Sequence, residues 1–292
     1  MRRERKERAI ELFFMLNSLV VIIVLLGIFY ILISNSIPAF REIGLREFFT
    51  SARWNPTSYS QIEYGILSQV VSTLMVTIGS MILSVPLGVA TAAYISELAS
   101  PKTKQVLKPV IEILAGIPSV VIGFLGIVLL GPAIARAFGL PNGLNALNGS
   151  ILLAIMSLPT IISLSEDAIS AVPREYKNAS LALGASRWQT LVKVTVPSAL
   201  SGITAAIMLG MGRAIGETMA VLMATGNAPR MPSSIFSSVQ TMTATIAIEL
   251  GEVPHHTTHY YSLFAVGLVL FIMTFAVNLV SDIILHKYEE VE

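Results

Sequence analysis

The chain has 292 residues, of which 54% are hydrophobic and only 13% are charged. This composition, with a mean hydropathy of +0.74, excludes a water-soluble globular protein, in which about a quarter of the residues are charged. The absence of cysteine excludes disulfides, thiolate metal sites and a thiol nucleophile. A formal net charge of +1 gives no support to a nucleic-acid-binding surface. We therefore expect an integral membrane protein.

Six apolar runs are long enough to cross a bilayer as helices, since a span needs about 20 residues. They cover residues 9–33, 66–98, 106–138, 147–172, 199–224 and 261–285. These runs are too long and alternate too little to be barrel strands. The sequence predicts an all-α membrane protein with six transmembrane helices, in which residues 66–285 form a five-helix core. We expect a basic cytoplasmic N-terminus over 1–8, an external loop over 34–65 and a cytoplasmic tail over 286–292.

The basic residues predict the orientation of these helices. If the N-terminus is cytoplasmic, that side holds thirteen of the 19 lysines and arginines, including every lysine, and the other side holds five. Such an excess is typical of cytoplasmic loops. A signal peptide is the alternative for the first run, but that run exceeds a usual signal and lacks a clear cleavage site. We expect a multi-pass protein of the inner or plasma membrane with both termini in the cytoplasm.

Proline and glycine interrupt several of these runs, at Pro86, Gly116, Pro118 and Pro159 among other positions. Interruptions are tolerated where the freed backbone carbonyls face protein or a water-filled path. Proline and glycine are also generally frequent in membrane helices. Taken together, the interruptions suggest a bundle that lines a path.

Three histidines, His255, His256 and His259, lie in the predicted external loop over 226–260. Their spacing could hold a divalent metal, but Glu252 is the only further ligand at a suitable distance along the chain. We favour a solvated loop and expect no bound metal.

The loop between the fourth and fifth runs has the pattern of a short helix-turn-helix. Pro173 is a residue type that starts helices, and Gly184 can end one in a left-handed conformation. A second helical turn follows from Ser186. The unit would expose Ala179, Leu183 and Trp188, and an exposed apolar knob of this kind usually docks into a partner.

The fifth run carries a charge near its middle, at Arg213. A charge at mid-bilayer costs at least about 2.5–3.5 kcal/mol. Glu217 lies four residues further on, so on a continuous helix it could pair with Arg213. Small residues surround this position and would let another helix or a substrate approach, namely Gly210, Gly212 and Gly216.

Two interpretations of this charged segment remain open. In the first, Arg213 and Glu217 form a buried pair that fixes the packing of the bundle. In the second, the guanidinium grips an oxyanion through parallel hydrogen bonds. We favour the second and predict a substrate path that includes Arg213, Glu217 and Thr218.

The cytoplasmic loop resembles the Glu-Ala-Ala-x3-Gly-x9-Ile-x-Leu-Pro motif of ABC importer permeases. The matching residues are Asn178-Ala179-Ser180, Gly184 and Val194-Thr195-Val196-Pro197. Asn178 stands where the motif has glutamate, and Ser180 where it has its second alanine. The resemblance implies that the loop 173–197 couples the chain to an ATP-hydrolysing subunit through Glu175, Asn178, Ala179, Ser180, Leu183, Gly184, Arg187 and Trp188.

No Gly-x4-Gly-Lys-Ser/Thr phosphate loop occurs in the sequence. We therefore expect a transport subunit rather than an enzyme. The chain would bind no cofactor itself, and ATP-Mg would bind the partner ATPase.

The sequence also resembles the phosphate-specific ABC transporter permeases over nearly its whole length. The similar segments are Gly212-Arg-Ala-Ile-Gly-Glu-Thr-Met-Ala-Val-Leu-Met223, Leu114-Ala-Gly-Ile-Pro-Ser-Val-Val121, Leu158-Pro-Thr-Ile-Ile162 and Ala182-Leu-Gly-Ala-Ser-Arg-Trp-Gln189. Ser165-Glu-Asp-Ala168, Met219-Ala-Val-Leu-Met223 and Phe264-Ala-Val-Gly-Leu-Val-Leu-Phe271 look more like the PstC than the PstA type of subunit.

This resemblance implies a MetI-like fold and import of inorganic phosphate. It also implies three kinds of partner: a PstA-like paralogous permease, PstB-like ATP-binding subunits and a PstS-like external phosphate-binding protein. Three alternatives remain open: a permease for sulfate or molybdate, an ion-coupled secondary transporter in which Arg213 and Glu217 act as a relay, and a membrane scaffold or sensor without flux.

Overall fold

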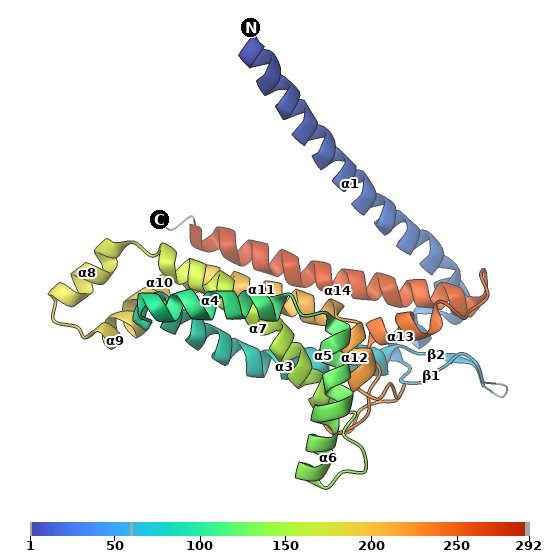
Figure 1. Ribbon diagram of the computed structural model, residues 1–292. Coiled ribbons are helices and arrows are strands. Elements are labelled where there is room, and N and C mark those ends of the chain that lie inside the picture. The colour runs from blue at the N-terminus through green and yellow to red at the C-terminus, as the bar shows by residue number, and fades with distance from the viewer. Residues whose placement is uncertain (1, 59–60, 290–292) are drawn as a thin grey trace.

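The computed structural model describes residues 2–58 and 61–289, and Figure 1 shows that most of them are helical. Two short strands, β1 (Trp54–Asn55) and β2 (Glu63–Tyr64), pair antiparallel. Five helices in the described part of the chain are long and apolar enough to cross a membrane. A sixth span results if Arg187–Ser198 and Leu200–Gly216, which meet at 68°, are counted as one. The predicted all-α membrane fold is confirmed.

Four long helices form the centre of the molecule: α3 (Leu67–Ala93), α7 (Ala146–Ala171), α11 (Leu200–Gly216) and α14 (Thr258–Glu289). Helix α7 packs between α3 and α11, and Ile161 at its middle is fully buried. Gly88 of α3 and Gly210 of α11 both lie against Ile161, where an added Cβ would come within 2.7 and 2.8 Å of its side chain. Small residues thus let the three backbones approach closely, as is usual in membrane bundles.

The first helix, α1 (Arg2–Ile43), is longer than the predicted span 9–33, and much of the predicted external loop 34–65 is helical. The apolar side chains of α1 from Ile10 to Leu26 are exposed, and Figure 1 shows this part of α1 projecting from the bundle. Near its C-terminal end, Phe29 lies 5.6 Å from Phe271 of α14, measured between ring centroids. The helix continues past Ile33 because that end is packed, with Ala39 fully buried.

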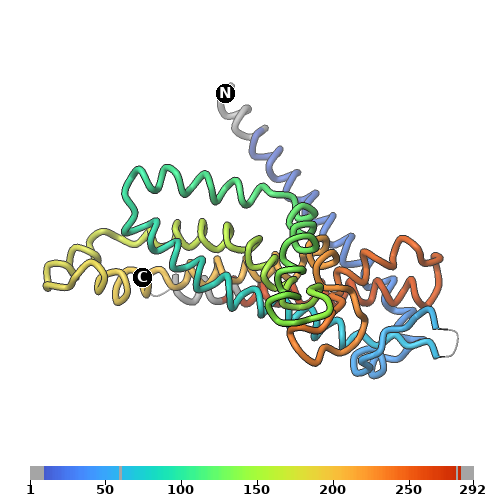
Figure 2. Tube along the Cα trace, turned by 60° about the horizontal axis from the view of Figure 1, so that its bottom comes forward, coloured from blue at the N-terminus to red at the C-terminus, as the bar shows by residue number. Residues whose placement is uncertain are grey.

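The third predicted span, 106–138, is divided into two limbs. Helix α4 (Pro101–Ala115) ends at Gly116, and a second limb begins at Ser119. This limb consists of α5 (Ser119–Leu125), the π-helical turn η2 (Gly126–Leu130) and α6 (Gly131–Phe138). Pro118 causes the division, because proline disfavours helical backbone at the preceding residue. Figures 1 and 2 show the chain turning sharply there, so the run 106–138 is divided at the interruption that Gly116 and Pro118 predicted.

One end of the molecule carries a small cap. It is built from the end of α1, α2 (Leu45–Thr50), the β1–β2 hairpin and α13 (Met242–Glu249). Phe48, Trp54, Met242 and Leu263 are buried together in its apolar core. Trp54 is only 4% exposed.

The opposite end carries the loop between α7 and α11 (Figure 1). Its elements are α8 (Arg174–Ala182), α9 (Arg187–Thr190), the π-helical turn η3 (Leu191–Thr195) and α10 (Val196–Ser198). A further π-helical turn, η1 (Tyr94–Leu98), extends α3 toward them. After α11, the short helix α12 (Met219–Ala224) packs against α5 and α7.

Candidate functional site: an interrupted helix and an exposed loop

The predicted fifth span is not one continuous helix. Helix α11 ends at Gly216, Glu217 has extended backbone angles, and α12 begins at Met219. Interrupted helices at membrane depth are tolerated where the freed backbone groups find partners within the protein. Here Thr218 Oγ1 donates to the carbonyl of Gly216 at 3.3 Å, and Thr243 Oγ1 of α13 donates to that of Glu217 at 2.9 Å. The interruption is thus stabilised by hydroxyl groups.

The predicted pairing of Arg213 with Glu217 is wrong. Four-residue spacing brings two side chains together only on a continuous helix, and the helix ends between these residues. Among the ion pairs of the described residues, none joins Arg213 to Glu217. The Glu217 carboxylate instead accepts a hydrogen bond from the backbone N–H of Ala220, at 3.4 Å, in the first turn of α12.

Arg213 lies in the last turn of α11, with its side chain exposed on the surface of the chain. A cation is favoured there because the carbonyl end of a helix is partially negative. Glu217 and Thr218 are half-buried, and Gly216 is exposed. The three predicted path residues therefore lie together at the helix interruption, and Arg213 is the most accessible of them.

The three glycines of α11 that lie near Arg213 in the sequence have different surroundings. A Cβ at Gly210 would come within 2.8 Å of Ile161, and one at Gly212 within 3.2 Å of Asn278 on α14. A Cβ at Gly216 would meet no atom within 4 Å. Gly210 and Gly212 lie at helix contacts, whereas Gly216 lies beside open space at the end of α11.

The loop between α7 and α11 has the predicted helix-turn-helix form. Helix α8 begins directly after Pro173, and Gly184 has a φ of +84°, which glycine adopts without strain. Ser186 caps α9: its hydroxyl accepts from the N–H of Gln189, and the Gln189 side chain accepts from the N–H of Ser186. This reciprocal capping box fixes the start of a helix of only four residues.

Apolar side chains project from this loop into solvent. Leu183 is 90% exposed and Trp188 is 65% exposed, and Ala179 is also exposed. Exposure of this kind at the end of a membrane protein marks a surface that a partner covers. The charged and polar residues of the predicted coupling set, Glu175, Asn178 and Arg187, are exposed as well, and Ser180 and Gly184 complete the turn.

One contact holds the loop against the rest of the chain, and another holds its two helices together. Lys177 of α8 forms an ion pair with Glu97 of η1, with 2.6 Å between Nζ and Oε1. Within the loop, the hydroxyls of Ser180 and Thr190 are 2.9 Å apart. Since η1 directly continues α3, a movement of α8 would be transmitted to a central helix.

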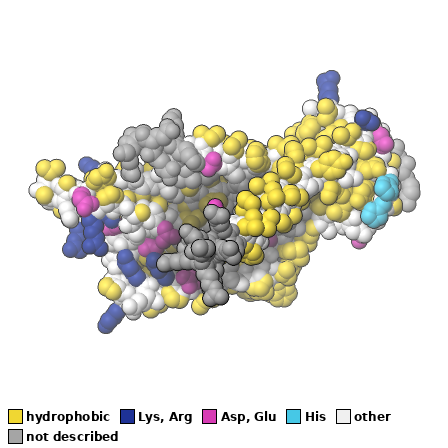
Figure 3. Space-filling model, turned by 90° about the horizontal axis from the view of Figure 1, so that it is seen from above, with side chains coloured by type: hydrophobic (Ala, Val, Ile, Leu, Met, Phe, Trp, Pro, Cys, Tyr) yellow, Lys and Arg dark blue, Asp and Glu magenta, His cyan; other side chains and the backbone are white. Residues whose placement is uncertain are grey.

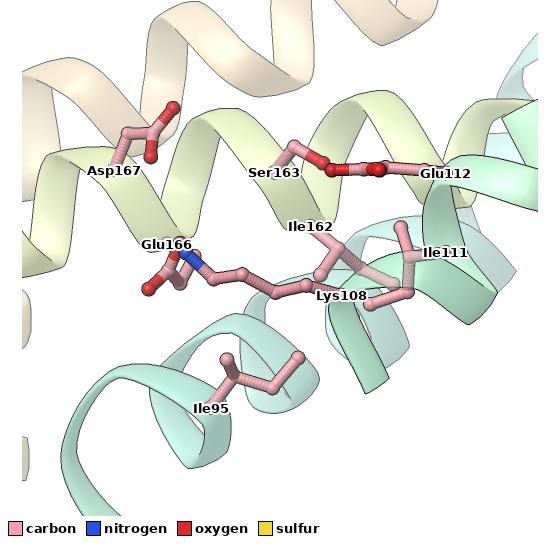
Figure 4. Close-up of a pocket in the computed structure, with 8 residues that line it drawn as sticks. All are labelled: Ile95, Lys108, Ile111, Glu112, Ile162, Ser163, Glu166 and Asp167. Carbon is pink, nitrogen blue, oxygen red and sulfur yellow. Dashed lines mark ion pairs between the residues drawn. The ribbon is translucent and has the colours of Figure 1, made fainter. Parts of the chain in front are cut away.

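The sequence pattern did not single out a buried charge at Glu166 of α7. Figure 4 shows Lys108 of α4 extended toward Glu166 of α7, with 2.7 Å between Nζ and Oε2. Glu166 is only 6% exposed, and a cavity of about 150 Å³ beside it is also lined by Glu112 and Asp167. The signal was a charge inside the apolar run 147–172, the same signal that identified Arg213. The pair ties α4 to α7.

The three histidines are not equivalent. His259 Nε2 lies 2.7 Å from Glu249 Oε2, and the same carboxylate accepts from Trp54 Nε1 at 2.9 Å. His259 thus belongs to the packed cap rather than to a solvated loop, because α14 begins just before it. Within the part of the chain that the structure describes, no group of three ligating side chains could hold a metal ion.

Residues 84–289 match the family described as binding-protein-dependent transport system inner membrane component. The chain is 44% identical to the probable ABC transporter permease protein YqgH of Bacillus subtilis, over 78% of this chain and 74% of YqgH. It is 31% identical to the phosphate transport system permease protein PstC of Mesorhizobium japonicum, over 93% of this chain and 88% of that protein.

Solved structures of ABC transporters share the fold. A bacterial alginate ABC transporter in complex with an alginate pentasaccharide-bound periplasmic protein superposes with a TM-score of 0.62, at 16% identity and over 94% of this chain and 93% of that chain. The MetNI methionine ABC transporter in an inward-facing conformation gives a TM-score of 0.59, at 19% identity, over 76% of this chain and 95% of that chain.

Proposed function

Because the chain belongs to the family of binding-protein-dependent transport system inner membrane components, we propose that it imports inorganic phosphate as a PstC-like permease. Permeases of this kind are multi-pass membrane subunits of ABC systems and not enzymes by themselves. Relatives named as phosphate transport system permeases align along most of the chain. The observation in the structure that carries the proposal is the exposed guanidinium of Arg213 beside the interruption between α11 and α12.

An exposed arginine at membrane depth needs a partner, because an unpaired charge is costly there. A paralogous, PstA-like permease would cover this face and leave a path between the two chains. Phosphate in that path would satisfy the guanidinium through two parallel hydrogen bonds. Glu217 and Thr218 lie beside the same interruption and would contact the anion as it passes.

Energy would come from PstB-like ATPase subunits that hold ATP-Mg. Their closure would push on Leu183 and Trp188, and the Lys177–Glu97 pair would carry the movement to η1 and α3. The path would then open outward to a PstS-like phosphate-binding protein. In this mechanism α8, α9 and both termini lie in the cytoplasm. The packed helices alternate between two discrete arrangements, one open to each side of the membrane.

The test is ATP-dependent uptake of labelled phosphate by vesicles that contain the reconstituted complex. We expect uptake to require the binding protein and ATP, and to resist competition by sulfate and molybdate. Stronger competition by sulfate or molybdate than by unlabelled phosphate would assign a different oxyanion. Uptake that persists without ATP would identify an ion-coupled carrier instead.

A further inference from the structure

A large hollow lies between η1 and the α8–α9 loop, and it is strongly basic. Its volume is about 530 Å³. Four cationic side chains line it together with one carboxylate, Glu97, which gives a formal net charge of +3; the cations are Lys104, Arg174, Lys177 and Arg187. Figure 3 shows Lys and Arg side chains gathered at this end of the molecule. Such a concentration of like charge attracts an anion from the surroundings.

The hollow has many hydrogen-bond donors to spare. Lys177 donates to Glu97 at 2.6 Å and Lys104 to the carbonyl of Ser96 at 2.7 Å, which leaves each ammonium group with two further N–H bonds. Arg174 and Arg187 make no side-chain hydrogen bond or ion pair with another described residue, so all their donors remain available. Donors that converge from α4, α8 and α9 suit a phosphate group, whose oxygens accept from several directions.

An apolar groove of about 680 Å³ adjoins the hollow. Leu98 and Leu191 line both, so the groove begins where the hollow ends. It continues along α3 and α11 past Val89, Ala93 and Leu200. These helices belong to the candidate membrane spans, and the span that contains α3 ends at Leu98. The hollow therefore lies at the level of lipid headgroups and the groove at the level of acyl chains.

From this combination we infer that the chain binds one anionic phospholipid, with its phosphate in the basic hollow and an acyl chain in the groove. Basic side chains at the cytoplasmic membrane surface attract anionic lipids, each by about 1 kcal/mol. The bound headgroup would offset part of the positive charge of the hollow and lie directly against Lys177, which links α8 to η1. Lipid composition would thereby affect how firmly the loop is held.

The experiment uses the full-length chain in nanodiscs of phosphatidylcholine with graded amounts of phosphatidylglycerol. Native mass spectrometry after release then counts the retained phosphatidylglycerol. The doubly substituted Arg174→Gln/Arg187→Gln chain should bind it about 30-fold more weakly, since two basic contacts are lost. Lys102→Gln/Lys193→Gln is the matched control, because it removes the same charge from exposed positions outside the hollow. The control should retain the lipid as the unsubstituted chain does.

Leu200→Trp tests the groove independently of charge, because a larger side chain there should displace the acyl chain and weaken retention. Inorganic phosphate, added to the nanodiscs that contain phosphatidylglycerol, distinguishes a site for a free anion from a site for a lipid, and it should leave the lipid bound. The inference fails if phosphatidylcholine is retained equally well, or if inorganic phosphate displaces the lipid at low concentration. It also fails if the double variant keeps the lipid as firmly as the control variant does, since the hollow would then not hold the headgroup.

Discussion

At Arg213 two physical effects act on one side chain. The carbonyl end of α11 favours a cation, which offsets part of the cost of placing it in the membrane. The exposure of the guanidinium leaves its donors free for a ligand or a neighbouring subunit. A purely structural arginine would be expected to have a partner within its own chain. Arg213 is therefore suited to a role that is completed only in the assembled transporter.

Arg213→Lys tests the shape of the cation separately from its charge. Lysine keeps the charge but lacks the planar fork, so one of two charge-assisted hydrogen bonds to phosphate is lost. That loss corresponds to about 1.5 kcal/mol, or roughly a tenfold decrease in uptake. Uptake of labelled phosphate by the reconstituted complex measures it, with copurification of the subunits as the assembly control. Arg230→Lys, in an exposed loop, should change neither. Equal uptake by the Arg213→Lys complex would exclude direct contact.

Glu217→Gln tests discrimination between anions. Phosphate carries a proton near neutral pH, and a carboxylate can accept a hydrogen bond from that O–H group. Sulfate offers only oxygens, which a carboxylate repels. Glutamine keeps an oxygen that can accept from the N–H of Ala220, so the start of α12 should remain intact. We expect a reduced preference for phosphate over sulfate in competition assays. An unchanged preference would show that Glu217 only accepts the hydrogen bond at the start of α12 and does not discriminate between the anions.

At the residue scale, the sequence singled out the charge at Arg213, whose role stays a prediction, whereas the pairing with Glu217 that the spacing allowed is not formed among the described residues. A charged residue in an apolar run can be recognised from sequence, because the free-energy cost of the charge depends on its depth in the bilayer. Pairing of Arg213 with Glu217 depends on a continuous helix between them. The helix instead ends there, and the hydroxyls of Thr218 and Thr243 bond to the carbonyls that the interruption frees. Thr243 lies on another helix, so no local pattern could have indicated it.

At the scale of elements, the loop between α7 and α11 was the most predictable part of the chain. Its capping signals are local: Pro173, Gly184 and Ser186 each act on the adjacent turn. The limits of α1 were less predictable, and Pro118 indicated where the third run is interrupted but not how sharply the chain turns there. Apolar length identifies a segment that can span, but tertiary packing decides where such a helix ends or bends.

Leu183→Asp should uncouple transport from ATP hydrolysis. Leu183 is 90% exposed, so the change should not affect folding of the chain. A carboxylate forced into an apolar pocket of the ATPase costs well over 1 kcal/mol, and uptake should fall by at least about tenfold. Uptake and ATP hydrolysis are measured on the same vesicles. Leu45→Asp is the control, because Leu45 is 57% exposed at the opposite end. If both variants transport normally, Leu183 does not dock.

Gly88→Ala should destabilise the bundle. The new Cβ would lie 2.7 Å from Cγ2 of Ile161, a methyl group of a β-branched side chain whose χ1 rotamer is strongly restricted in a helix. Such overpacking costs about 1–3 kcal/mol, which a lower midpoint of thermal unfolding in detergent would report. Gly27→Ala is the matched control, since nothing lies within 4 Å of that position. Adding Ile161→Ala should remove the specific penalty of Gly88→Ala, and equal midpoints for the two glycine variants would contradict the packing.

For the whole molecule, the sequence predicted the fold class and the number of spans better than their paths. The apolar composition indicates a membrane protein. Helices follow because backbone N–H and C=O groups in lipid must form hydrogen bonds within the protein. The two ends of the molecule differ as the charge pattern suggests, with basic side chains around α8 and α9 and histidines at the cap (Figure 3). The arrangement of α4 against α7 could not be predicted, because it depends on the long-range Lys108–Glu166 pair.

The orientation of the molecule can be tested directly because the chain contains no cysteine. A single Lys102→Cys or Arg230→Cys substitution then provides a unique thiol, and both positions are exposed. Lys102 lies just after the span that ends at Leu98, and Arg230 lies in the connection to α13 of the cap. With both termini in the cytoplasm, a membrane-impermeant maleimide should label only the Arg230→Cys chain in spheroplasts and only the Lys102→Cys chain in inverted vesicles. The opposite pattern would place the α8–α9 loop outside, where no ATP-hydrolysing subunit could reach Leu183. The proposed coupling and the inward direction of transport would then both be excluded, whatever anion Arg213 binds.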